Sequence, residues 1–125
     1  MAYLTDRKRA QGLGSAKSGT KHFWEQRLSA IALALLTPLF LFPLAYTLGD
    51  SYEGVRTAYA HPVNAIIGVA FFITAFLHFF QGVQVVIEDY VHGRWGLVLI
   101  ISTRLLSALF ALIGAFAILK IAFTG

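Results

Sequence analysis

Residues 62–88 read PVNAIIGVAFFITAFLHFFQGVQVVIE. Before Glu88, the only ionisable side chain in this run is His78. About 20 apolar residues are enough for a helix to cross the ~30 Å hydrocarbon core of a bilayer. Pro62 suits the first turn of such a helix, because its missing N–H has no intrahelical partner there. The run therefore predicts a transmembrane helix over residues 62–88.

Two further apolar runs flank this segment. Residues 28–48 contain no charged side chain, and residues 97–123 contain only Arg104 and Lys120. None of the runs shows the alternation of polar and apolar residues that marks a β-barrel strand, and unbroken apolar runs cross lipid as helices. The predicted fold class is all-α: an integral membrane protein with three transmembrane helices.

The composition points the same way. The 125 residues fit one domain, and 58% of them are hydrophobic while 13% are charged. Soluble domains are nearer half apolar and a quarter charged. The chain has no cysteine, which excludes a disulfide framework, thiolate zinc sites and cysteine-ligated iron–sulfur clusters within it.

The basic residues set the expected orientation. The tail at residues 1–27 carries six Lys or Arg, whereas the loop at residues 49–61 carries one. Cytoplasmic segments are enriched in Lys and Arg, so the N-terminus is expected in the cytoplasm. Three spans then place the loop at residues 89–96 in the cytoplasm and the C-terminus in the periplasm. The charge is therefore interpreted as a topology signal, with membrane lipid and no nucleic acid as partner. Residues 11–20, rich in Gly, Ser and Lys, are expected to be irregular.

His78 is the first candidate for chemistry. An ionisable residue deep in a span is costly, and it is a functional candidate for that reason. Neutral imidazole binds iron well, which favours an axial haem ligand. The alternative is a neutral His that is hydrogen-bonded across a helix interface. Because only one well-buried His is available, a second chain would have to supply the other axial ligand, which predicts a hetero-oligomer.

The spacing after His78 places a second group on nearly the same face. Asp89 follows by 11 residues, which is three helical turns plus about 20°, so the two lie ~16 Å apart along the axis. Gly82, one turn after His78, leaves room for a flat macrocycle, although close helix packing is an equally good reason for a membrane glycine.

Asp89 and Tyr90 are expected at the membrane boundary. The Tyr90 phenol can donate to a quinone carbonyl, and the Asp89 carboxylate can orient donors or relay protons. The alternatives are an interfacial aromatic anchor and a solvated helix end. Arg27, just before the first span, is either a positive-inside anchor or a partner for a haem propionate or a quinone oxygen.

The sequence HFFQG at residues 78–82, followed by Asp89 and Tyr90, resembles the signature of the small hydrophobic anchor subunit of bacterial succinate dehydrogenase, respiratory complex II. That family has a His, a Gly four residues later, and Asp-Tyr at eleven and twelve. Gly19, Phe23 and Arg27 also resemble the family, and residues 12–20 and 22–27 resemble its alphaproteobacterial branch. One departure is Lys21, which stands where some relatives carry a His.

The resemblance implies a complex in the bacterial inner membrane. Its other members would be a flavoprotein with FAD, an iron–sulfur subunit and a cytochrome b subunit. Succinate would be oxidised on the flavoprotein, and electrons would pass through the iron–sulfur clusters to ubiquinone. This chain would be an anchor with no catalytic residue and no complete active site of its own.

The resemblance also implies roles for single residues. His78 would be one axial ligand of haem b, with the second His from the cytochrome b subunit. Tyr90 would hydrogen-bond the quinone head, Asp89 would support that site, and Arg27 would lie near a haem propionate. Two alternatives remain: a purely structural, haem-free anchor in which His78 only packs, and a cytochrome b subunit of another respiratory oxidoreductase, which usually has more spans and several haem histidines.

Overall fold

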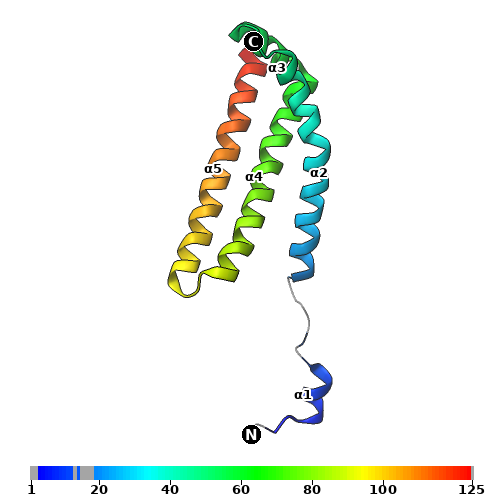
Figure 1. The fold of residues 1–125 in the computed structure, drawn as a ribbon, viewed down its shortest axis with the longest axis vertical. Coiled ribbons are helices and arrows are strands. Elements are labelled where there is room, and N and C mark those ends of the chain that lie inside the picture. The colour runs from blue at the N-terminus through cyan, green and yellow to red at the C-terminus, as the bar shows by residue number, and fades with distance from the viewer. Residues whose placement is uncertain (1–2, 13, 15–18, 125) are drawn as a thin grey trace.

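The computed structural model describes residues 3–12, 14 and 19–124. In chain order, the helices are α1 (Asp6–Gln11), α2 (Gly19–Tyr46), α3 (Tyr52–Ala60), α4 (Pro62–Tyr90) and α5 (Arg94–Thr124) (Figure 1). This part of the chain contains no strand. The predicted all-α fold is confirmed.

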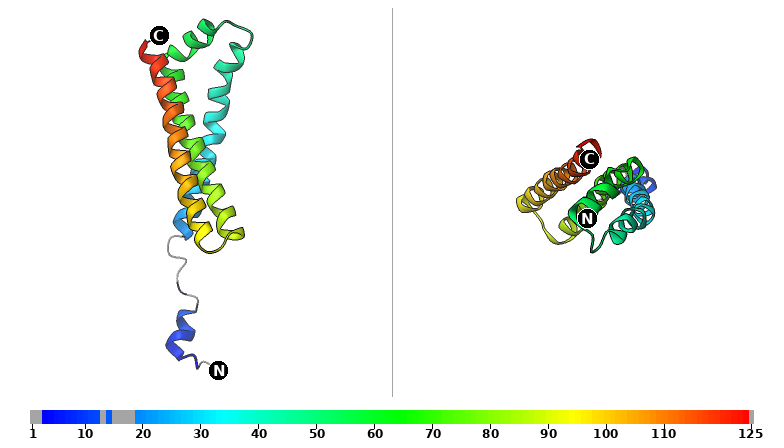
Figure 2. Two further views of the ribbon diagram at one scale, coloured as in Figure 1. Left: turned by 90° about the vertical axis from the view of Figure 1, so that its left-hand side faces the viewer. Right: turned by 90° about the horizontal axis from the view of Figure 1, so that it is seen from above.

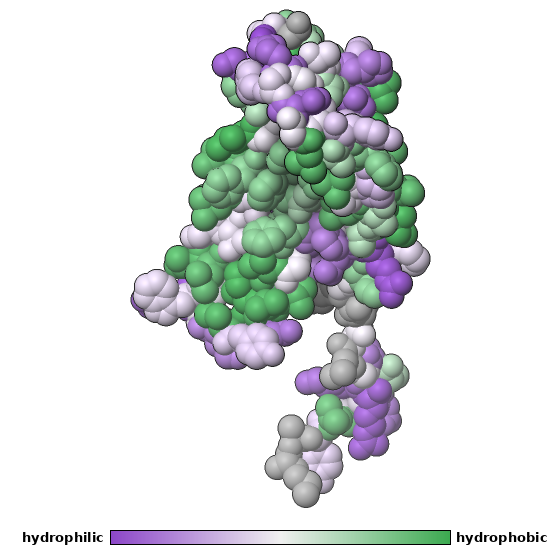
Figure 3. Space-filling model, turned by 45° about the horizontal axis from the view of Figure 1, so that its top comes forward, coloured by the Kyte–Doolittle hydropathy of each residue, from purple (hydrophilic) through white to green (hydrophobic). Residues whose placement is uncertain are grey.

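Three of these helices are long enough to span a bilayer. The helices α2, α4 and α5 have 28, 29 and 31 residues, and each is apolar over most of its length. At 1.5 Å per residue they are about 42–46 Å long, which exceeds the ~30 Å hydrocarbon core. Apolar side chains cover the middle of the molecule, and polar ones gather at the α3 end (Figure 3). The chain is a multi-pass membrane protein, as predicted.

The helix bounds differ from the predicted spans mainly at the polar ends. The helix α2 begins at Gly19, well before the apolar run at residues 28–48, because backbone hydrogen bonding does not stop at the lipid boundary. Residues 49–61 were expected to be a loop, but they contain α3. Part of the segment 11–20 is also helical, since α1 includes Gln11 and α2 includes Gly19 and Thr20. Residues 13 and 15–18 lie outside the described residues.

The helix α4 lies between α2 and α5 (Figures 1 and 2). Every fourth residue of one α4 face meets α5. The contacts pair Gly68 with Ile118, Phe72 with Gly114, Phe76 with Phe110, and Phe80 with Arg104. Glycine on one helix receives a large side chain from the other at two of these steps, so the two backbones approach closely.

A second face of α4 packs against α2. The rings of Phe71 and Phe40 stack with their centroids 4.4 Å apart, and His78 meets Ser29 nearer the other end. Across the described residues, α2 and α5 do not pack against each other. The three spans therefore form a row with α4 in the centre, and the flanks of α2 and α5 are left uncovered by this chain.

The helix α3 lies across the ends of the three spans that are farthest from α1 (Figure 1). Tyr59 is buried at 3% exposure, and its hydroxyl donates to the carbonyl oxygen of Phe40 at 2.8 Å. Burial raises the pKa of the Tyr59 phenol above its ordinary value. Arg56 donates to the carbonyl oxygen of Thr124 at 2.8 Å. Through these two bonds α3 ties the far end of α2 to the end of α5.

Candidate functional site

The antiparallel packing of α2 and α4 brings Ser29 and His78 to one depth. Ser29 lies ten residues after the start of α2, and His78 lies twelve residues before the end of α4. The hydroxyl oxygen of Ser29 is 2.8 Å from Nδ1 of His78. His78 is half-buried, and Ser29 is 6% exposed. The intramembrane histidine is therefore hydrogen-bonded to a neighbouring helix through one ring nitrogen.

Two further groups complete a small polar cluster around Ser29. Its hydroxyl is 2.8 Å from the carbonyl oxygen of Gln26, one turn earlier in α2. It is also 3.0 Å from Oε1 of Gln81, a side chain that is 5% exposed. Sequence reasoning did not find Ser29. The available signal was a small hydroxyl near the start of the first apolar run, at the depth that His78 has in the next span.

His78 and Arg27 line the same groove between α2 and α4. The groove has a volume of about 420 Å³, and its other lining residues are Phe23, Gln26, Ala30 and Ile31. The Arg27 guanidinium carbon lies 4.9 Å from the centre of the Phe23 ring. An imidazole can bind a metal, and a guanidinium can pair with a carboxylate. The groove thus holds one side chain that could bind a haem iron and one that could pair with a propionate.

Gly82 lies one turn after His78 on α4, and the space around its Cα is open. A Cβ atom placed on Gly82 would meet nothing within 4 Å in the described chain, whereas one on Gly68 would meet Ile118 at 3.3 Å. Close packing against another helix of this chain is therefore not the reason for glycine at position 82. The space at Gly82, one turn from His78, is therefore open to a group from outside the chain.

Asp89 and Tyr90 form a separate group at the end of α4. They are exposed, with Tyr90 at 82%, and they lie ~16 Å or more along the helix from His78. No residue in the described ranges gives either side chain a hydrogen bond. The predicted site residues therefore fall into two groups: His78 with Arg27 along the α2–α4 groove, and Asp89 with Tyr90 at the end of α4.

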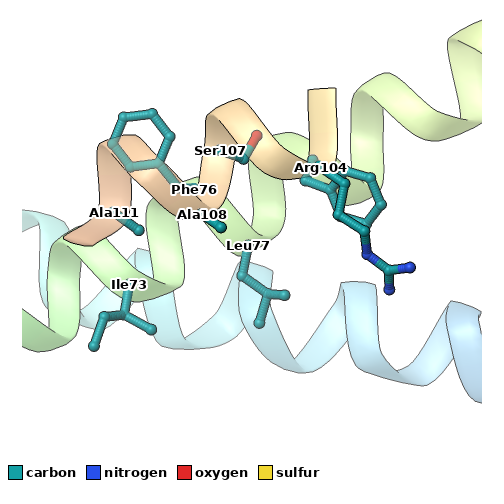
Figure 4. A pocket seen from close by; sticks show the side chains of 8 residues that line it. Ile73, Phe76, Leu77, Arg104, Ser107, Ala108 and Ala111 are labelled. Carbon is teal, nitrogen blue, oxygen red and sulfur yellow. The ribbon is translucent and has the colours of Figure 1, made fainter. Parts of the chain in front are cut away.

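A second groove lies between α4 and α5 (Figure 4). It has a volume of about 290 Å³, and it is lined by Ile73, Phe76, Leu77, Phe80, Arg104, Ser107, Ala108 and Ala111. The Arg104 guanidinium carbon lies 5.0 Å from the centre of the Phe80 ring, and the guanidinium points away from Ile73 and Ala111. None of the predicted site residues lines this groove.

Comparison with known proteins identifies the family of the chain. The family profile described as succinate dehydrogenase/fumarate reductase transmembrane subunit matches residues 1–122. The chain belongs to this family. The resemblance to the hydrophobic anchor subunit of succinate dehydrogenase, including its alphaproteobacterial branch, is confirmed.

Three relatives of this succinate dehydrogenase/fumarate reductase family carry anchor-subunit names. The succinate dehydrogenase hydrophobic membrane anchor subunit of Paracoccus denitrificans is 38% identical over 122 residues, covering 98% of this chain and 88% of that protein. The protein of the same name from Rickettsia bellii is 37% identical over 105 residues, covering 81% and 82%. The succinate dehydrogenase membrane anchor subunit of Reclinomonas americana is 35% identical over 81 residues, covering 62% and 68%. No solved structure gives a significant match.

The metal-binding side chains of this chain fit a haem better than a bare metal ion. The structure, in its described ranges, contains no cluster of three or more His, Cys, Asp or Glu side chains that could hold a metal ion. Structural and catalytic sites for bare ions use about three or four protein ligands. A haem iron already has four porphyrin nitrogens and takes only axial ligands from protein. A single His facing open space therefore fits a haem that is shared with another chain.

Proposed function

We propose that this chain is the membrane anchor subunit of a succinate dehydrogenase in the bacterial inner membrane. In this proposal it binds the flavoprotein, iron–sulfur and cytochrome b subunits, and it contributes half of a haem b site and part of a ubiquinone site. Family membership and the anchor-subunit names of three relatives support the anchoring role. The observation that carries the haem site is the single groove shared by His78 and Arg27.

The haem site would be built from the α2–α4 groove. Nε2 of His78 would bind the iron, Arg27 would pair with a propionate carboxylate, and Gly82 would leave space for the macrocycle edge. A haem bound there would supply a one-electron carrier inside the membrane. Because the other histidines of the chain lie outside the apolar runs, the second axial ligand would come from the cytochrome b subunit.

The ubiquinone site would lie at the end of α4. The Tyr90 hydroxyl would donate to a quinone carbonyl, and the Asp89 carboxylate would hold a proton close to the aqueous phase. Both side chains are exposed, as residues that complete a site with a partner chain must be before assembly. Ubiquinone is the substrate here, and FAD and the iron–sulfur clusters would belong to the partner subunits.

Charge supports a cytoplasmic location for this end of the molecule. Eight of the ten Lys and Arg residues lie in the tail, at Arg94 or at Arg104 in the nearer half of α5, and only Arg56 and Lys120 lie near the opposite end. The asymmetry favours a cytoplasmic N-terminus and a periplasmic C-terminus. The flavoprotein and iron–sulfur subunits would then dock beside Asp89 and Tyr90.

A reduced-minus-oxidised spectrum of the purified native complex tests the haem site. We expect a b-type signal in the unaltered complex that is lost or strongly altered in His78→Leu. His92→Leu is the matched control, because His92 is exposed in the α4–α5 turn and should leave the spectrum unchanged. A normal b-type signal in His78→Leu would remove this residue from the haem site. An unaltered complex without any b-type signal would favour a haem-free anchor.

A further inference from the structure

Ser29 is the one hydrogen-bonding partner of His78 within the described residues. We infer that Ser29 is a positioning residue: its hydroxyl oxygen accepts a hydrogen bond from Nδ1–H of His78 and so fixes the ring with Nε2 unprotonated and available to iron. This inference rests on the proposed haem site and adds a residue to it. Nothing in the family pattern at residues 78–82 and 89–90 includes Ser29.

The direction of the hydrogen bond follows from a count of protons. A serine hydroxyl has a single proton to donate. The other two neighbours of Ser29 Oγ are the Gln26 carbonyl oxygen at 2.8 Å and the Gln81 amide oxygen at 3.0 Å, and both can only accept. If the hydroxyl donated to His78, both of these oxygens would face Ser29 without a proton between them. The hydroxyl therefore donates within the Gln26–Gln81 pair, and Nδ1 of His78 carries the ring proton.

Burial favours this assignment, because the assignment leaves one acceptor oxygen beside Ser29 without a proton, whereas the alternative leaves two. Ser29 and Gln81 are 6% and 5% exposed, so bulk water does not compensate a mismatched contact. A buried polar group without a partner costs about 1–3 kcal/mol. The same burial keeps the three groups in place, since Gln26 belongs to the same helical turn as Ser29 and Gln81 lies less than one turn from His78. The cluster is thus set before any ligand binds.

The fixed proton position matters for metal binding. A neutral imidazole has one protonated nitrogen, and only the other can bind a metal. A ligand histidine that donates its second N–H to an oxygen is held in orientation and becomes a more basic ligand. Stronger donation favours ferric over ferrous iron. Loss of the Ser29 hydroxyl should therefore shift the haem midpoint potential to more positive values.

The experiment compares Ser29→Ala, Ser29→Thr and Ser107→Ala in the purified native complex. The readouts are the haem midpoint potential from an optical redox titration and the rate of haem loss. Ser29→Ala should shift the potential positive and speed haem loss about tenfold or more, as second-shell changes do. Ser29→Thr keeps the hydroxyl and should restore both values. Ser107, which is 5% exposed on α5 and makes no contact with His78, is the matched control.

Several results would overturn the inference. They are an unchanged potential in Ser29→Ala, an equal shift in Ser29→Thr, an equal shift in Ser107→Ala, or failure of Ser29→Ala to assemble while Ser107→Ala assembles. The last result would make Ser29 a packing residue. If Ser29→Ala changes nothing but His78→Leu abolishes the b-type signal, then the haem site stands and only the role of Ser29 falls.

Discussion

The ring of Phe72 on α4 lies over Gly114 of α5 so closely that a Cβ atom on residue 114 would overlap it. One turn away along the same seam, Ile118 of α5 fills the space above Gly68 of α4. The two contacts are reciprocal, since each helix gives one glycine and one large side chain. Lipid offers no hydrophobic driving force for helix association, so this close fit is what stabilises the α4–α5 pair.

Gly114→Val should weaken the α4–α5 pair. The added side chain has no space beside Phe72, and overpacking of a well-packed interior costs roughly 1–3 kcal/mol. We expect a lower thermal unfolding temperature of the purified complex and less assembled complex in the membrane. Gly114→Ala should also be destabilising, and adding Phe72→Leu should recover part of the Gly114→Ala loss, since the smaller side chain makes room for the new methyl group. A Gly114→Val complex as stable as the parent would contradict the contact.

Gly82→Val should behave differently, because no described residue lies where its side chain would go. The proposed haem site predicts assembled complex at the parent level but a reduced haem-to-flavin ratio. The ratio is measured from the b-type absorbance and the bound FAD of the purified complex. Gly114→Val is the matched control, and it should lower haem and flavin together. Parent-level haem in Gly82→Val would argue against a macrocycle beside this residue.

Tyr90→Phe should impair quinone reduction and leave the flavoprotein untouched. Loss of one hydrogen bond of about 0.5–1.5 kcal/mol to the quinone predicts a roughly 2–10-fold lower kcat/KM for ubiquinone. Succinate oxidation with a water-soluble dye should continue at the parent rate. Tyr46→Phe is the control, because Tyr46 is similarly exposed, at 86%, but lies at the α3 end of the molecule, far from Tyr90. Equal losses with quinone and with dye in Tyr90→Phe would indicate misassembly.

Tyr59→Phe should destabilise the α3 end of the molecule. It removes the hydrogen bond from the phenol to the Phe40 carbonyl oxygen, at a cost of about 0.5–1.5 kcal/mol. Thermal unfolding of the complex measures the effect, and Tyr52→Phe on the exposed side of α3 should change nothing. The haem spectrum should stay at parent values, because the Tyr59 contact at Phe40 lies 11 residues, or ~16 Å along α2, from Ser29. A change in the haem signal would show coupling along α2.

The raised pKa of Tyr59 adds a pH dependence to this prediction. The folded state holds the phenol proton more tightly than the unfolded chain does, so its contribution is complete below the unfolded pKa of about 10. The contribution is lost as the pH rises above that value. The parent complex should therefore lose stability more steeply than Tyr59→Phe in this alkaline range. If the stability of the parent and of Tyr59→Phe fell equally with pH in this range, the raised pKa of Tyr59 would be contradicted.

The three spans could be predicted from sequence because each is a long apolar run, and the demand for internal hydrogen bonds in lipid then leaves little choice of structure. The short helix α3 could not, since Glu53, Arg56 and small residues give residues 52–60 no apolar run. What orders it is tertiary: the Tyr59 bond to α2 and the Arg56 bond to α5. The start of α2 was likewise hidden by its polar composition.

Some features of the candidate site could likewise be predicted from the sequence, and others depend on tertiary structure. The relative depth of His78, Asp89 and Tyr90 follows from residue counting on one helix, so the sequence is sufficient for it. The part played by Ser29 depends on the register between two helices, which no local pattern records. The role of Gly82 depends on the three-dimensional structure for a different reason, because the sequence cannot distinguish a glycine packed against a neighbouring side chain from one that faces open space.

The arrangement of the spans in a row also affects how long the unassembled chain persists in the cell. Before it meets its cytochrome partner, the chain exposes to lipid an α2–α4 groove that contains His78, Gln26 and Arg27. Polar groups that face lipid without a partner are costly, and less stable chains are degraded faster in cells. We therefore expect the half-life of the orphan chain to be short, so that partner synthesis sets its abundance.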